Sequence, residues 1–333
     1  MVSRWQFRQR ITGSHRFSNL VATTTPLNNT KEASPIHKEL LQYIVSIARD
    51  SSLRLENNFV PRAQAIDDIE FYVIDRIEVM EETEGATGSL SSLKQYAINV
   101  KHELEEIDRN LFHRLRTEIS AGADHSRQLL HWLSTYLGDK VLNAPPGAEG
   151  YDLLDVFING LLSPHEIPAE TIIRESEMVF YQKTPARIIL ELVKRAEFKL
   201  TDVFFDIGAG LGQPVLLVNL LAGVTAKGIE FERAFCSYAS ACATTLHLQQ
   251  VHFINADARE ADYSSGTIFF LYTPFSGNML QKVMTRLHNE AKKRSVKIFT
   301  YGPCTPAVAQ QPWLIEVTDG QHHPDHLAEF ISR

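Results

Sequence analysis

The chain has 333 residues, of which 44% are hydrophobic and 22% are charged, and its formal net charge is −7. This length allows two ordinary domains, each with its own core. No apolar run approaches the roughly 18 residues that cross a bilayer, so we expect no membrane contact. The negative charge disfavours a broad nucleic-acid surface and favours a small-molecule or protein substrate.

Residues 1–33 are basic, with no acid before Glu32, and they are rich in Ser, Thr and Asn. This composition predicts a disordered arm, and it is also that of a transit peptide, which the sequence leaves open as an alternative.

Three cysteines occur without a Cys-x-x-Cys pair: Cys236, Cys242 and Cys304. They indicate free thiols in a reducing compartment, so we expect a cytoplasmic protein.

Residues 34–150 are predicted to form an all-helical domain. From about Pro35 to Leu137 the apolar residues recur at helical spacing, and turn signals are sparse. Four helices are expected, of which the third, from about Ser89 to Ala121, is the longest. The fourth is expected from about Asp124 to Leu137. The Pro/Gly-rich segment 143–150 has the composition of a linker, so we place the domain boundary there.

An acidic run in the third of these helices contains Glu103, Glu105, Glu106 and Asp108. Consecutive helical positions point in different directions, so the run predicts a solvated face and not a metal site.

From residue 151 to residue 333 the rhythm changes to short β-branched and aromatic runs that alternate with helical stretches. This alternation predicts βαβ units and a parallel sheet. The expected strands are 203–206, 225–230, 251–255, 267–272 and 296–301, followed by 313–318 and 326–332. The last two runs have no helical pattern between them, so we expect them to form a closing antiparallel pair.

A glycine-rich loop, DIGAGLGQP, follows the first of these runs and extends from Asp206 to Pro214. The dinucleotide fingerprint Gly-x-Gly-x-x-Gly would need its third glycine at position 213, which is Gln213. The spacing here is Gly-x-Gly-x-Gly, and an acid precedes it by two residues. Such an acid would repel a pyrophosphate but would accept hydrogen bonds from an ammonium group. The loop therefore favours an amino-acid-bearing nucleoside over NAD.

This pattern resembles the class I S-adenosylmethionine-dependent methyltransferases, from about Glu175 to the C-terminus. In that family the loop after the first strand reads acid-x-Gly-x-Gly-x-Gly. The resemblance implies an α/β fold with a doubly wound seven-strand sheet, which here follows an all-helical N-terminal domain, and it implies S-adenosyl-L-methionine as the cofactor. It also implies contacts between the cofactor and the loop at Asp206, Gly208, Gly210 and Gly212.

Two further acids match the family's cofactor site. Glu230, in KGIEFE, stands at the end of the second strand, where the family places an acid that accepts hydrogen bonds from both ribose hydroxyls. Glu232 is disfavoured for this role because it falls just inside the next helix. Asp257, in INADARE, matches the acid that faces the adenine amino group.

The segment VFYQKTPARIILELV resembles the one that precedes the first strand in many members of the family. There a Tyr and a Thr-Pro pair cover the methionine end of the cofactor, which implies that Tyr181 and Thr184 contact it. On local grounds Thr184 is also a good N-cap, with Pro185 in the first helical turn.

The segment FFLYTPFSG, from Phe269 to Gly277, follows the fourth strand. Nucleic-acid methyltransferases of this class carry (Asp/Asn/Ser)-Pro-Pro-(Tyr/Phe) here, and the missing Asp or Asn weakens an interpretation as a base methyltransferase. We predict that Tyr272 and Thr273 orient a substrate by hydrogen bonding and that Phe275 walls the site. An ordinary strand-to-helix loop is the alternative.

DVFFDIGAGLGQPVLLVNLLAG, followed by KGIE, is similar to the non-SET histone-lysine methyltransferases of the disruptor-of-telomeric-silencing type. In that family the glutamine of the loop helps to frame the active site, so Gln213 is a candidate contact. The family's Asn-Asn-Phe segment is Tyr-Thr-Pro-Phe here, and its basic nucleosome-binding region has no evident counterpart.

The sequence therefore predicts an enzyme that transfers a methyl group to an N or O nucleophile of a protein side chain or a small molecule. The alternatives are a noncatalytic scaffold whose helical half binds a partner, and a nucleic-acid base methyltransferase. No metal is expected, because HHPDH, from His322 to His326, lacks a distant set of ligands. The sequence names neither the acceptor nor an oligomeric state.

Overall fold

The computed structural model describes residues 35–121, 124–143, 152–317 and 325–333. They group into two compact units. The first extends to Phe112 and includes Thr135–Leu137, and the second holds His113–Ser134 and Gly138–Arg333. The predicted basic arm and all but the first residue of the predicted linker lie outside the described residues, so the domain boundary near residue 150 stays a prediction.

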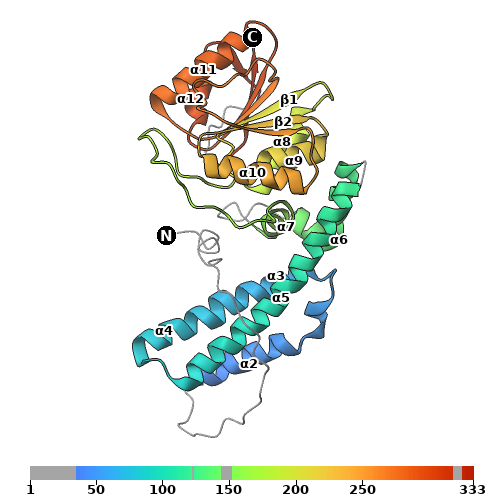
Figure 1. Ribbon diagram of the computed structural model, residues 1–333, viewed down its shortest axis with the longest axis vertical. Coiled ribbons are helices and arrows are strands. Elements are labelled where there is room, and N and C mark those ends of the chain that lie inside the picture. Colours follow the sequence, from blue (N-terminus) through green and yellow to red (C-terminus); the bar gives the residue numbers. More distant parts are fainter. Residues whose placement is uncertain (1–34, 122–123, 144–151, 318–324) are drawn as a thin grey trace. The chain divides into compact units, whose positions relative to one another are not determined.

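The first unit is helical, as the periodicity predicts (Figure 1). Its elements are α2 (Pro35–Arg49), η1 (Ser51–Arg54), α3 (Phe59–Asp68), η2 (Ile69–Ile74), α4 (Asp75–Glu84) and α5 (Gly88–Ala121), which continues into the second unit. The second predicted helix is interrupted by η2, a turn of π-helix. Leu40, Ile44 and Val73 belong to the core of the first unit, whereas Leu41 is 42% exposed.

The acidic run of α5 is a solvated face only in part. Arg62 of α3 is fully buried, and its Nε donates to Asp108 Oδ1 at 2.7 Å. Its other nitrogens donate to the carbonyl oxygens of Leu53, Leu55 and Glu56. The expectation for Asp108 was therefore wrong, because a buried guanidinium is retained only with a charged partner and saturated hydrogen bonds.

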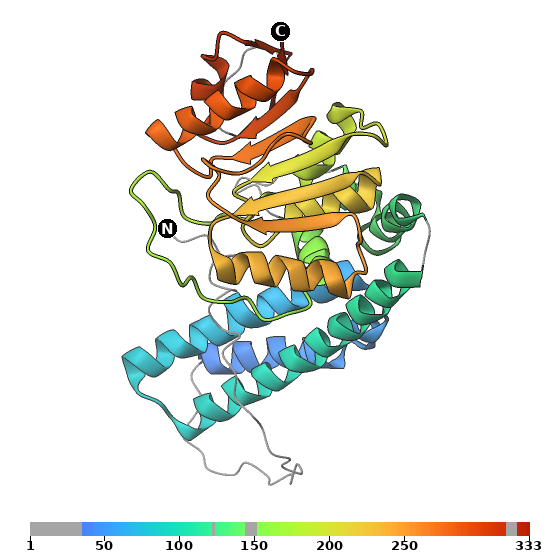
Figure 2. The ribbon, with the colours of Figure 1, turned by 45° about the horizontal axis from the view of Figure 1, so that its top comes forward.

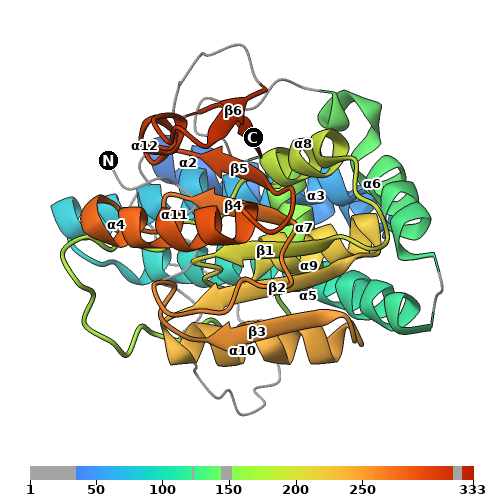
Figure 3. The same cartoon turned by 90° about the horizontal axis from the view of Figure 1, so that it is seen from above.

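A seven-strand sheet forms the centre of the second unit. Its strands are β1 (Val203–Ile207), β2 (Thr225–Glu230), β3 (Val251–Asn255), β4 (Ile268–Tyr272), β5 (Lys297–Tyr301), β6 (Leu314–Glu316) and β7 (Ala328–Ser332). The spatial order is β3-β2-β1-β4-β5-β7-β6 (Figure 3). The first five strands are parallel, and β7 is antiparallel to both β5 and β6. The predicted doubly wound sheet and its closing antiparallel pair are confirmed.

Helices cover both faces of this sheet, with α11 and α12 on one side and α8, α9 and α10 on the other (Figure 1 and Figure 2). The helices of the second unit are α6 (His125–Leu142), α7 (Leu153–Leu162), α8 (Ala186–Ala196), α9 (Gln213–Ala222), α10 (Arg233–Thr245), α11 (Gly277–Ala291) and α12 (Thr305–Ala309). Side chains alternate between the faces. Phe205 and Phe269 pack with Val283 of α11 in one core. None of the described helices is long and apolar enough to cross a membrane.

The start of α8 is capped from another element. The helix begins at Ala186 with Pro185 as its N-cap residue, so the assignment of Thr184 as N-cap was wrong. The backbone N–H of Ala186 donates instead to Asp155 Oδ1 at 2.8 Å. Asp155 is fully buried and also closes the capping box of α7 with Asp152. One carboxylate therefore serves two helix N-termini, whose unpaired N–H groups favour negative charge.

Fold stability offers a direct test in the first unit. We expect Arg62→Ala to lower the free energy of unfolding by about 3–5 kcal/mol, because it removes a buried charged pair together with the donors to three carbonyl oxygens. Arg54→Ala is the matched control. Its pair with Glu103 is exposed, so we expect a loss below about 1 kcal/mol. Urea unfolding followed by circular dichroism measures both, and equal losses would contradict the structural role of Arg62.

Candidate functional site

A pocket opens at the carboxyl ends of the parallel strands, between β1 and β4. At this point the strand order reverses: the chain continues from β1 to β2 on one side and from β4 to β5 on the other. Ligands of open α/β sheets bind at such a switch point. The pocket holds about 1040 Å³, its open mouth included. The predicted site residues that line it are Tyr181, Thr184, Asp206, Gly208, Gly210, Glu230, Asp257, Tyr272, Thr273 and Phe275. Gly212 and Gln213 are not among the lining residues.

The glycine loop is shaped by close approaches that a side chain would prevent. Gly208 and Gly210 have φ values of 82° and 53°, in the region that favours glycine. A Cβ at Gly208 would lie 2.3 Å from Cβ of Pro274, and a Cβ at Gly210 would lie 2.2 Å from the Tyr181 ring. The loop therefore contacts both the segment after β4 and the segment before α8, and its backbone forms the floor of the pocket.

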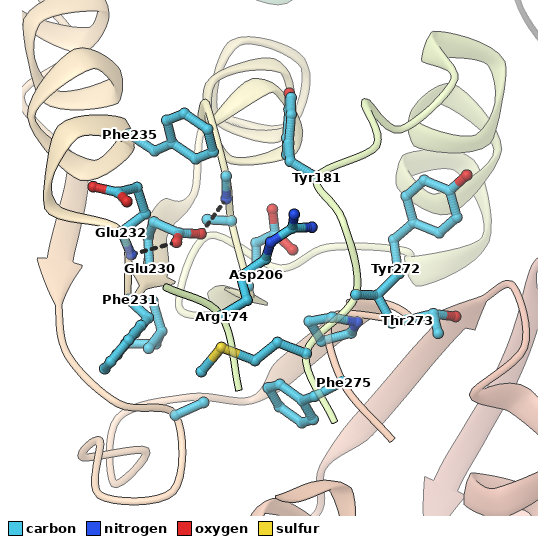
Figure 4. Close-up of a pocket in the computed structure, with 18 of the residues that line it drawn as sticks. Arg174, Tyr181, Asp206, Glu230, Phe231, Glu232, Phe235, Tyr272, Thr273 and Phe275 are labelled. Carbon is cyan, nitrogen blue, oxygen red and sulfur yellow. Dashed lines mark hydrogen bonds between the residues drawn. The ribbon is translucent and has the colours of Figure 1, made fainter. Parts of the chain in front are cut away.

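Two carboxylates, those of buried Asp206 and half-buried Glu230, face this floor from neighbouring strands (Figure 4). Asp206 is 3% exposed, and burial, together with the negative charge of Glu230, holds its pKa well above the usual range. Burial also raises the pKa of Glu230, although its carboxylate accepts hydrogen bonds from the backbone N–H groups of Gly210 at 2.6 Å and Glu232 at 2.7 Å. Two acids in one pocket repel each other, and a ligand that brings an ammonium group and hydroxyl donors relieves that repulsion. The pair fits S-adenosylmethionine in this respect.

The opposite end of the pocket from Tyr181 fits a planar base. In Figure 4, Phe231 and Phe275 both lie on the side of the pocket away from Tyr181, and Ala258 and Met279 also line the pocket. Asp257 lines it as well and supplies carboxylate oxygens among these apolar walls. Flat apolar walls with a few polar groups are typical of nucleoside sites.

A segment without helix or strand, Ser163–Pro185, runs past the pocket between α7 and α8 and is here termed the strap (green in Figure 1). Glu232 holds it: the carboxylate accepts hydrogen bonds from Thr171 N at 2.7 Å, Thr171 Oγ1 at 2.6 Å and Ile172 N at 2.8 Å. Burial alone would raise the pKa of Glu232, but these bonds and that from Ala234 N lower it to about 2. Glu230 thus faces the pocket while Glu232 anchors the strap, a role that the sequence did not reveal.

The segment after β4 carries the remaining predicted residues. The Thr273 hydroxyl donates to the carbonyl oxygen of Tyr301 and accepts from Cys304 N, both at 3.1 Å, so it is engaged within the protein. The Tyr272 hydroxyl donates to Gln182 Oε1 at 3.2 Å, and the rings of Tyr272 and Tyr301 lie 4.9 Å apart. Tyr272 and Gln182 both line the pocket, so this end presents an aromatic wall and amide groups.

Gln213 begins α9 and is 4% exposed, and neither its amide nitrogen nor its amide oxygen has a hydrogen-bond partner among the described residues. Its contact with a ligand stays a prediction. Gly212 contacts Phe253 and Ala239, where a Cβ would have no room.

Among the described residues, no group of three or more His, Cys, Asp or Glu side chains is arranged to bind a metal ion. His322 and His323 of the HHPDH motif lie outside it. The three cysteines are free and buried, and burial raises the pKa of Cys304.

Comparison with known proteins places this pocket in a family context. Residues 175–292 match the family model described as "Histone methylation protein DOT1". The second unit carries a class I S-adenosylmethionine-dependent methyltransferase domain. The resemblance to the disruptor-of-telomeric-silencing type is thereby confirmed over these residues, and the predicted enzyme class with it. No curated protein sequence matches the chain.

Several solved methyltransferase structures are similar at low identity. An RNA methyltransferase from Salinibacter ruber, in complex with S-adenosyl-L-homocysteine, is 20% identical over 45% of this chain and 92% of that chain, with a TM-score of 0.35. An S-adenosylmethionine-dependent methyltransferase from Thiobacillus denitrificans, with the same ligand, is 18% identical over 37% and 53%, with a TM-score of 0.29. Because these scores are below 0.5, the assignment of the fold rests on the strand order of this chain.

Removing the charge of Asp206 should stabilise the ligand-free fold and weaken ligand binding. A folded pKa above the unfolded value of about 3.9 means that folding stability falls as the pH rises through this range. We therefore expect Asp206→Asn to raise the melting temperature of the ligand-free methyltransferase at pH 8, with little gain near pH 4. Its affinity for S-adenosylhomocysteine should fall about 10- to 100-fold.

Thermal melts and calorimetry provide these values, with Asp262→Asn as the control. Asp262 is exposed, and a hydrogen bond from Ser264 lowers its pKa. Asparagine there should not stabilise the protein at pH 8. Unchanged ligand affinity in Asp206→Asn would contradict the assignment of Asp206.

Anchoring of the strap by Glu232 predicts a second, graded effect. Glu232→Ala removes all three hydrogen bonds to the strap, so amide exchange at Thr171 and Ile172 should rise and ligand affinity should fall. Thr171→Val removes one of the three bonds and should have a smaller effect on both. Hydrogen exchange with mass spectrometry measures the first quantity and calorimetry the second. If exchange at the strap were unchanged in Glu232→Ala, the anchor would be disproved.

Proposed function

We propose that this methyltransferase methylates an amine nitrogen on the side chain of a protein substrate. The observation that carries the proposal is the match of residues 175–292 to a family described by histone methylation. That description applies to the family. For this chain, the proposal is supported by the residues at the end of the pocket near Tyr272.

Charge and aromatic surface at that end favour a cationic amine. The Tyr272 ring lines this end and packs against the Tyr301 ring, which is not among the lining residues, and aromatic faces attract ammonium groups. Burial raises the pKa of Tyr301 to about 12, and the neighbouring acids Asp325, Asp155 and Glu191 contribute to the rise. Negative potential around Tyr301 would draw a protonated side chain toward the site.

Bound S-adenosylmethionine supplies a methyl group on a positively charged sulfur. The acceptor nitrogen must present a free lone pair to that group, so the amine has to enter neutral or lose its proton first. A tyrosine hydroxyl is protonated at neutral pH, and the raised pKa of Tyr301 keeps it so. We therefore assign to Tyr272 the orientation of the nitrogen, and not the removal of its proton.

The charge of the pocket counts against methylation of nucleic-acid bases. Among the described lining residues, Arg174 is the one Lys or Arg, against Glu170, Asp206, Glu230, Glu232 and Asp257. A polyphosphate backbone binds where Lys and Arg neutralise it. The noncatalytic scaffold is disfavoured by the same residues, since a scaffold does not need buried, mutually repelling carboxylates.

Transfer of a labelled methyl group tests the proposal. We incubate the enzyme with tritiated S-adenosylmethionine and fractionated cell extract, with Asp206→Ala as the inactive control. Label should enter protein and appear, after hydrolysis, in an N-methylated basic amino acid. Label confined to nucleic acid or to small molecules would contradict the proposal.

Tyr272→Phe should lower kcat/KM about tenfold or more toward the labelled protein, with S-adenosylhomocysteine affinity nearly unchanged, because only orientation of the acceptor is lost. Tyr96→Phe, at an exposed tyrosine of α5, should leave both quantities unchanged.

A further inference from the structure

Arg259 joins two acids at the base-binding end of the pocket. Its Nε lies 3.0 Å and 2.9 Å from the two carboxylate oxygens of Asp257, and its backbone N–H donates to Asp257 Oδ1 at 2.8 Å. The far edge of the same guanidinium donates to Glu175, from Nη2 at 2.7 Å and from Nη1 at 3.1 Å. This is the two-pronged geometry of the strongest arginine–carboxylate pairs.

The two acids belong to different parts of the site. Asp257 lines the pocket, and Arg259 lies behind it and is not among the lining residues. Hydrogen bonds from Arg259 are the main cause of the lowered pKa of Asp257, so the carboxylate stays ionised. Nη2 of Arg259 also donates to Asp257 Oδ2, at 2.5 Å, so three N–H donors of Arg259 reach this carboxylate. A carboxylate has about four acceptor positions, which leaves room for one more donor from the pocket.

Glu175 belongs to the strap. It follows the part of the strap that Glu232 anchors and precedes Glu177, whose carboxylate accepts from Asn278 N at 3.0 Å and Met279 N at 2.8 Å at the start of α11. Between these two anchors, Arg259 is the residue whose hydrogen bonds connect the strap to Asp257.

We infer that Arg259 is a positioning residue that holds Asp257 toward the amino group of adenine and, through Glu175, couples recognition of the base to closure of the strap. The inference rests on the assignment of Asp257 to the adenine amino group. It goes beyond methyl transfer, because it names what reads the base and how that contact reaches the strap.

The coupling has a physical cause. In the ligand-free protein the Arg259, Asp257 and Glu175 side chains are 23%, 18% and 48% exposed, so water screens their ion pairs. A base bound against Asp257 displaces that water, and charge-assisted hydrogen bonds strengthen as the local dielectric falls. Arg259 is then held more firmly, and Glu175 and the strap with it.

Two ligands that differ only at the base test the reading of adenine. S-adenosylhomocysteine carries the 6-amino group, and S-inosylhomocysteine carries an oxygen in its place. Calorimetry on the full-length enzyme should show about a 10- to 100-fold preference for the amino ligand, as expected for a hydrogen bond to a charged group. In Arg259→Gln the preference should shrink to within about threefold, whereas absolute affinity for the oxo ligand should change little.

Arg286→Gln is the matched control. Arg286 donates to the carbonyl oxygens of Glu260 and Ala261 in the same loop without contacting Asp257. Its substitution should keep the wild-type preference. An equal loss of affinity for both ligands in Arg259→Gln would assign Arg259 a merely structural role and overturn the inference.

Hydrogen exchange tests the link to the strap. In the wild type the amino ligand should protect residues 171–177 more than the oxo ligand does at matched saturation. Glu175→Gln should retain the ligand preference but lose this difference in protection. A retained difference would refute the coupling through Glu175.

The two assignments fail in different ways. Wild-type enzyme that binds both ligands equally would refute the role of Asp257 and this inference, while cofactor binding stands. Wild-type enzyme that binds neither would refute cofactor binding itself.

Discussion

Asp206 is buried and Glu230 is half-buried at the ends of two adjacent parallel strands, where their negative charges repel each other, and the rest of the site depends on this constraint. β1 and β2 are parallel, so their carboxyl-terminal residues lie at the same edge of the sheet. Backbone N–H groups of Gly210 and Glu232 partly satisfy Glu230. The remaining carboxylate charge favours a cationic ligand with several hydrogen-bond donors. This preference defines the chemistry of the pocket more closely than its volume does.

Neighbouring acids of the same type serve different purposes because their surroundings differ. Glu230 is directed into the pocket, whereas Glu232, two residues later, caps α10 and binds the strap. Glu177 caps α11, and Asp155 caps both α7 and α8. Carboxylates at helix N-termini accept N–H groups that have no helical partner. By this means the strap and the helices that frame the pocket are fixed without a sheet or a disulfide.

Much of the fold and of the cofactor site was predictable because its signals are local. Five alternating runs marked the parallel strands, and the glycine spacing together with Asp206 was enough to disfavour a dinucleotide cradle. Other features depend on residues that are distant in sequence. The bond between Asp155 and Ala186 spans 31 positions, that between Glu232 and Thr171 spans 61, and that between Arg259 and Glu175 spans 84. Local propensity made Thr184 the N-cap of α8, but a tertiary partner supplied the cap, and the buried pair of Arg62 with Asp108 was hidden in an ordinary acidic run.

The central claim is that ligand binding relieves two carboxylates whose pKa values are raised by burial, with the charge of Glu230 adding to the rise at Asp206. A ligand ammonium group near Asp206 would lower these pKa values, so binding should release protons at a pH between the ligand-free and the ligand-bound pKa values. Calorimetry of S-adenosylhomocysteine binding at several pH values from about 4 to 8, repeated in buffers of different ionisation enthalpy, counts those protons. The account predicts net proton release that disappears in the double variant of Asp206→Asn with Glu230→Gln, and binding of the wild type with no exchange or with uptake of protons would contradict it.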